Sequence, residues 1–62
     1  MCEANAYLIK EGAQEQLIME AVDKVEPDEG GLRLVNIFGE QKFIKARIQA
    51  LSLVDHKILL QP

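Results

Sequence analysis

The residue with the most evident chemistry is Cys2, the only cysteine in the chain. An initiator methionine is normally removed when a small residue follows it, so Cys2 is a candidate for the mature N-terminus. Its α-amine and thiolate would then form a five-membered chelate ring, and planar nitrogen–sulfur coordination suits Ni(II) or Cu(II). One thiolate is too few for a tight site, whereas two copies on a two-fold axis supply two thiolates and two amines. A lone cysteine is also often a small buried hydrophobe, and the residues alone leave both interpretations open.

No other group of residues predicts catalysis. His56 is the only histidine, and it lies in an expected turn between Asp55 and Lys57, where a polar side chain faces water. Ser52 precedes His56 by four residues, but no nucleophile motif accompanies the pair. The phosphate-binding, dinucleotide-binding and zinc-protease motifs are missing from the sequence. We therefore expect no enzyme activity and assign no catalytic residue.

A short basic segment suggests an alternative function, RNA binding. Lys42, Lys45 and Arg47 surround Phe43, and in a single strand Phe43, Lys45 and Arg47 would share one face. Such a face could stack a base and contact phosphates, as small RNA-binding barrels do. The net charge of −3 opposes this interpretation, because phosphate contacts supply most non-specific affinity for nucleic acid. RNA binding is kept as the alternative, with a solvated strand face as the simpler explanation.

Length and composition predict one small folded domain over residues 1–62. Hydrophobic residues make up 48% and charged residues 27%, the balance of a folded domain. A core this small usually needs support from a disulfide, a metal or a second copy, and one cysteine excludes a disulfide within the chain. The first residues resemble no signal peptide, and no apolar run is long enough to cross a membrane. We expect a cytoplasmic protein.

Turn signals divide the chain into short apolar runs, which predict an all-β fold of about six strands closed into a small barrel. A phase shift after Met19 predicts a β-bulge near residues 21–23 that bends the second strand. Residues 41–52 also fit an amphipathic helix, and strand is preferred there because the start signal for a helix is weak. The predicted strands are 4–10, 16–25, 32–38, 41–46, 47–54 and 57–61.

Several of these strands are apolar on both faces. Val35 and Ile37 would lie on one face of the third strand, with Leu34 and Phe38 on the other. A chain of 62 residues cannot cover both faces of its own sheet. The surplus predicts a homodimer.

The whole sequence resembles the CooT family of small nickel-binding proteins, which are associated with maturation of nickel-containing carbon monoxide dehydrogenase. The resembling segments are the Met1–Cys2 start and residues 6–8, 17–20, 37–40 and 53–60. The resemblance implies an SH3-like β-barrel that forms a homodimer and binds Ni(II) through Cys2 of each chain. It further implies a metallochaperone that delivers nickel to a recipient enzyme such as carbon monoxide dehydrogenase. Some family members have been labelled predicted RNA-binding proteins.

Overall fold

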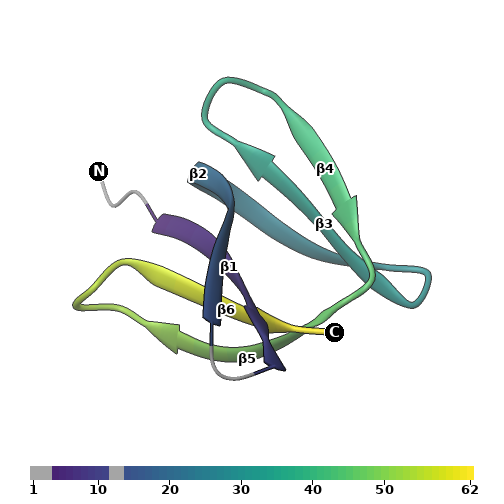
Figure 1. The fold of residues 1–62 in the computed structure, drawn as a ribbon. Coiled ribbons are helices and arrows are strands. Elements are labelled where there is room, and N and C mark those ends of the chain that lie inside the picture. Colours follow the sequence, from purple (N-terminus) through teal and green to yellow (C-terminus); the bar gives the residue numbers. More distant parts are fainter. Residues whose placement is uncertain (1–3, 12–13) are drawn as a thin grey trace.

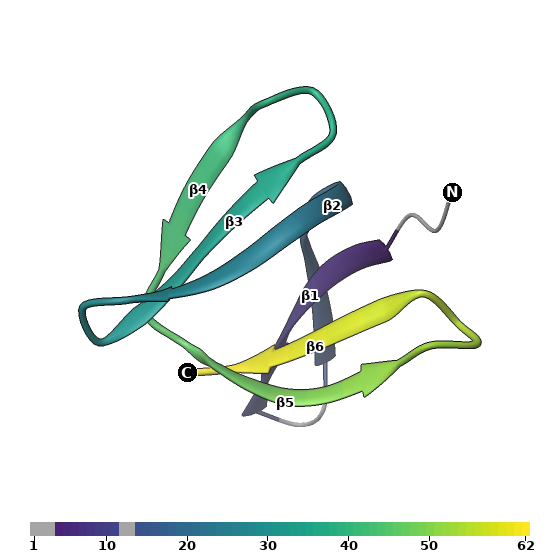
Figure 2. The same cartoon turned by 180° about the vertical axis from the view of Figure 1, so that it is seen from behind.

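The computed structural model describes residues 4–11 and 14–62, which form six β-strands in one sheet. The spatial order of the strands is β4-β3-β2-β1-β6-β5 (Figures 1 and 2). Neighbouring strands are antiparallel except β1 and β6, which run parallel. The strands are β1 (Ala4–Lys10), β2 (Gln14–Asp28), β3 (Gly31–Asn36), β4 (Gln41–Ile44), β5 (Arg47–Ser52) and β6 (Lys57–Gln61).

The predicted all-β class is confirmed, and each predicted strand has a counterpart. The segment 41–52 forms β4 and β5 rather than a helix. Its helical spacing arises because apolar residues on two different strands are joined through a bend at Lys45 and Ala46. β2 is longer than expected, since it continues past Val25 to pair with β3 as far as Asp28.

The predicted bulge lies within β2. Val22 pairs with Asn36 and Lys24 pairs with Val35, so Asp23 is an extra residue opposite β3. The backbone of Ala21 has a φ of 54°, a left-handed conformation that L-residues rarely adopt. These irregularities bend β2, so that its first half pairs with β1 and its second half with β3.

The expected barrel closure is wrong. The outer strands of the sheet are β4 and β5, and over the described residues neither pairs with the other. β4 has four residues, and Ala46 donates its N–H to the carbonyl oxygen of Ile44, which turns the chain away from β4. β5 then returns beside β6 instead of β4, and the result is an open, strongly curled sheet (Figure 1).

The core lies inside the curl of the sheet. Leu34 and Leu60 have no exposed surface, although their strands, β3 and β6, are separated in the sheet by β2 and β1. The sheet can bury them together only because β2 bends. The remaining members of the core cluster are Ala6, Met19, Val22, Leu32, Ala46 and Ile58.

Candidate metal centre and partner surfaces

Cys2, the predicted nickel ligand, lies outside the described residues, which begin at Ala4. The structure does fix the place where the chain after Cys2 enters the sheet. Asn5 donates its N–H to the carbonyl oxygen of His56 over 2.9 Å, and this bond starts the parallel pairing of β1 with β6. The beginning of β1 therefore lies against the turn between β5 and β6.

His56 is exposed in that turn, as predicted. Its φ of 55° is left-handed, so the turn requires a conformation that Gly or Asn adopts more readily. Ser52 Oγ donates to Asp55 Oδ2 over 3.1 Å, so the serine hydroxyl is directed toward the aspartate and not toward the imidazole. Over residues 4–11 and 14–62, no group of three or more His, Cys, Asp or Glu side chains could hold a metal ion.

An apolar surface adjoins the start of β1. Ala4, Leu51 and Ile58 line a hollow of about 270 Å³, with Leu53 and His56 at the same site. The hairpin between β5 and β6 carries highly exposed side chains: Leu53 is 82% exposed and Val54, the next residue, is 89% exposed. Large apolar side chains that face water together are typical of protein–protein contacts. We name the set Leu51, Leu53 and Val54 the hairpin patch.

The basic segment does not form the continuous face expected of an RNA site. The strand predicted over residues 41–46 ends at Ile44 in the structure, and the chain bends at Lys45 and Ala46 before β5 begins at Arg47. Lys42 and Phe43 are neighbours in β4 and so point to opposite faces of the sheet. Lys42 Nζ donates to the carbonyl oxygen of Ile18 over 3.2 Å.

Two acidic residues, Glu15 and Glu26, lie beside basic side chains on the surface. Glu26 accepts a hydrogen bond from Arg33 at 3.0 Å, and Glu15 lies 3.4 Å from Lys57 Nζ. Both pairs are substantially exposed, and such pairs contribute little to stability. Each pair joins one carboxylate to one cation on the surface. Neither arrangement brings two carboxylates together, as acid–base catalysis by a carboxylate pair requires.

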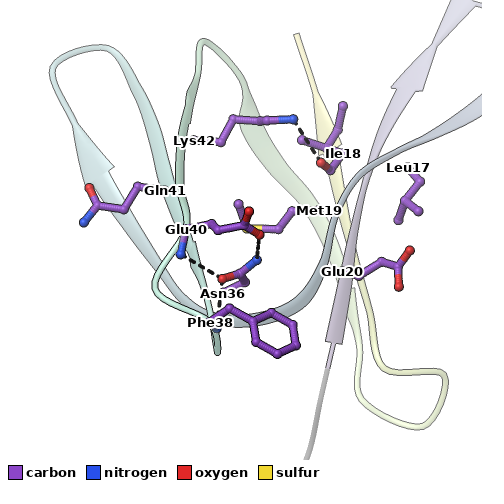
Figure 3. Close-up of a pocket in the computed structure, with 9 residues that line it drawn as sticks. All are labelled: Leu17, Ile18, Met19, Glu20, Asn36, Phe38, Glu40, Gln41 and Lys42. Atoms are coloured by element: carbon purple, nitrogen blue, oxygen red, sulfur yellow. Dashed lines mark hydrogen bonds between the residues drawn. The ribbon is translucent and has the colours of Figure 1, made fainter.

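Asn36 organises a second hollow that the sequence analysis missed (Figure 3). This side chain is only 6% exposed, and its Oδ1 accepts from the N–H groups of Phe38 and Glu40 at 3.0 and 2.9 Å. Its Nδ2 donates to Glu40 Oε1 over 2.7 Å. The sequence signal was the spacing Asn-x-x-Gly-Glu, a polar turn whose first side chain can bond to backbone further along.

These features define a class of protein: a small all-β protein with exposed apolar surfaces of the kind that bind other proteins. Over the described residues, no side chains are grouped as a catalytic site. The family model of CooT, the CO dehydrogenase accessory protein, matches residues 1–61. The chain belongs to the CooT family.

Comparison with solved structures agrees with this family assignment. The chain is 55% identical to a protein designated CooT from Carboxydothermus hydrogenoformans, whose crystal structure superposes with a TM-score of 0.89. The similarity covers 97% of this chain and 95% of that one. A search of curated proteins found no match. No helix among the described residues is long and apolar enough to cross a membrane.

Proposed function

We propose that this protein binds Ni(II) through the Cys2 residues of two copies and donates the metal to carbon monoxide dehydrogenase. The observation that carries the proposal is the position of the hairpin patch, next to the start of β1. Cys2 precedes Ala4 by two residues, and two residues of extended chain span at most about 7 Å. A dimer formed through the hairpin patch would therefore bring two copies of Cys2 toward one another.

The small number of metal-binding side chains in one copy supports a site shared between two copies. Since residues 4–11 and 14–62 hold no three-ligand group, one chain offers the metal little beyond the thiolate, amine and adjacent amide of Cys2. Two copies supply two thiolates and two nitrogen donors, a set that fits the planar preference of Ni(II). Ligands at a chain terminus stay reachable for exchange, which suits a protein that hands its metal on. Membership of a family of CO dehydrogenase accessory proteins makes that nickel enzyme the natural recipient.

A nickel titration of reduced, untagged protein tests the metal site. We expect thiolate-to-nickel charge-transfer absorption that saturates at one metal per dimer, with the stoichiometry read from native mass spectrometry. Cys2→Ser should abolish the absorption and tight binding while leaving the circular dichroism spectrum unchanged. Retained affinity in Cys2→Ser would refute the ligand assignment.

The dimer is tested separately without metal. We expect Leu53→Ser combined with Val54→Ser to shift sedimentation equilibrium toward the monomer, because both side chains lose apolar contact area. Phe38→Ser is the matched control, since Phe38 is 77% exposed in the turn between β3 and β4, away from the hairpin patch. Loss of the dimer in the control alone, or a wild-type monomer at micromolar concentration, would reject the hairpin patch as the interface.

A further inference from the structure

The first half of β2 has a sheet neighbour on one side only. Over Gln14–Val22 this strand pairs with β1, and from Val22 onward it pairs with β3. Within the part of the chain that the structure describes, residues 14–20 therefore border no strand on the side away from β1. An edge of this kind is a template for an added strand.

The direction of the free backbone groups follows from the register. Asn5 donates its N–H to His56, so the backbone groups of Asn5 point to β6. Because direction alternates along a strand, those of Leu8 point to β2, where Leu8 pairs with Gln16. The residues of β2 on either side of Gln16 then direct their N–H and C=O groups away from β1.

Those neighbours are Glu15 and Leu17. The next outward backbone group along β2 is the carbonyl oxygen of Ile18, and it already has a hydrogen-bond partner. Ala6 pairs with Met19 and Tyr7 pairs with Leu17, so Ile18 is an extra residue on β2. Its carbonyl oxygen accepts the hydrogen bond from Lys42 Nζ. A flexible lysine side chain thus satisfies a backbone acceptor that a neighbouring strand would otherwise satisfy.

This edge borders the hollow organised by Asn36. The hollow measures about 460 Å³ and lies between β2 and the β3–β4 hairpin (Figure 3). Leu17 is 45% exposed and Phe38 is 77% exposed, so both offer apolar surface to an occupant. The hairpin holds its shape through Asn36, so the hollow is formed before any partner arrives.

We propose that the 14–20 edge of β2 accepts an extended, basic segment of a partner protein as an added strand. The free N–H and C=O groups of Glu15 and Leu17 select an extended chain, since only such a chain can pair with them in register. Two carboxylates, those of Glu20 and Glu40, line the hollow with one cation, Lys42, and this excess of negative charge favours Lys or Arg side chains on that chain. The net charge of −3 on the whole protein acts in the same direction. Lys42 releases Ile18 when the strand docks.

This surface is distinct from the hairpin patch, which is formed by β5 and the turn that follows it. The inference therefore stands or falls independently of nickel binding. It also differs from dimerisation, because pairing this edge with the same edge of a second copy would bring like charges of Glu15 and Glu20 from both chains together.

The test uses the full-length ¹⁵N-labelled protein and two capped hexapeptides, one alternating lysine with valine and the other alternating glutamate with valine. Titration is followed by amide chemical shifts. We expect the lysine peptide to shift the amides of Leu17, Ile18 and Lys42, with the glutamate peptide at least about tenfold weaker, the effect of ~1.4 kcal/mol. Glu15→Pro removes one outward N–H and should weaken binding about fivefold, the loss of one hydrogen bond. Glu15→Ala, which keeps that N–H, is the matched control.

Three results would overturn the proposal: equal binding of both peptides, no shift along residues 14–20, or equal weakening by Glu15→Pro and Glu15→Ala. Shifts at this edge that depend on protein concentration alone would assign it to a second copy instead. Should Glu15→Pro fail to fold, Lys42→Met decides. That variant leaves Ile18 without its competing donor and should tighten binding of the lysine peptide, and unchanged affinity would refute the added strand.

Discussion

Replacing Asn36 by Ala should destabilise the protein by about 2–3 kcal/mol. The substitution removes two hydrogen bonds accepted by Oδ1 and one donated by Nδ2. Each is worth about 0.5–1.5 kcal/mol net when it is formed within a protein. The side chain is 6% exposed, so water replaces these bonds only in part. A domain of this size has a total stability on the order of 3–9 kcal/mol, so the loss is a large fraction of it.

The measurement is urea unfolding monitored by circular dichroism, together with a thermal melt. For a domain of this size each kcal/mol lowers the melting temperature by about 4–8 °C, so we expect a fall of about 10–20 °C. Ser52→Ala is the control, because it removes one exposed hydrogen bond within another turn. It should cost less than about 0.5 kcal/mol, as surface substitutions usually do.

A loss below about 0.5 kcal/mol in Asn36→Ala would refute the reasoning, because it would mean that water satisfies the hairpin as well as Asn36 does. Asn36→Asp sharpens the test. It keeps both accepted bonds but places a second carboxylate against Glu40, so its destabilisation should be greater at pH 7 than at pH 4. Equal destabilisation at both pH values would show that the contact between Asn36 and Glu40 is unimportant.

Three further substitutions test other parts of the structure. Leu34→Ala should destabilise by about 3–5 kcal/mol, since it leaves a cavity at a fully buried site, and urea unfolding that shows less than about 1.5 kcal/mol would place Leu34 outside the core. Gly31→Ala should be more destabilising than Gly30→Ala in the same assay, because a Cβ at Gly31 would lie 2.6 Å from the backbone oxygen of Ile44 and force the strands apart, whereas one at Gly30 meets no atom and costs only the strain of the left-handed φ of 79°; the reverse order would contradict the close approach of β3 and β4. His56→Gly should raise the melting temperature by relieving the left-handed φ and should leave nickel affinity unchanged, and a loss of affinity would make the imidazole a ligand.

Local patterns predicted the strands well because each depends on neighbouring residues. All six predicted strands have counterparts in the structure, and the phase shift after Met19 correctly located the bend in β2. Barrel closure was wrong because it requires the outer strands β4 and β5 to pair, although they are consecutive in the chain, and the bend at Lys45 and Ala46 turns them apart. No periodicity in the sequence records that bend.

The candidate sites show the same difference between features that depend on residue type and features that depend on contacts across the sheet. Cys2 was identified by its type and position, and it lies outside the described residues, so its role stays a prediction. The hollow beside Asn36 was missed, because it needs Ile18 and Lys42, which are 24 residues apart, to meet across the sheet. The shared face of Phe43, Lys45 and Arg47 was expected from strict alternation, and the break between β4 and β5 removes it.

The parallel pairing of β1 with β6 has a consequence for how the molecule assembles. Asn5 pairs with Lys57, so the sheet is complete only when segments about fifty residues apart meet. Closing a loop of that length costs entropy before any contact compensates for it, which favours early formation of the local β2–β3–β4 meander and late docking of β6. The β5–β6 hairpin is itself local and can form early, but until β6 docks on β1 the hairpin patch has no fixed position relative to the start of β1. A chain that lacked its last strand would leave β5 without its sheet neighbour. The proposed dimer would therefore select complete, folded molecules.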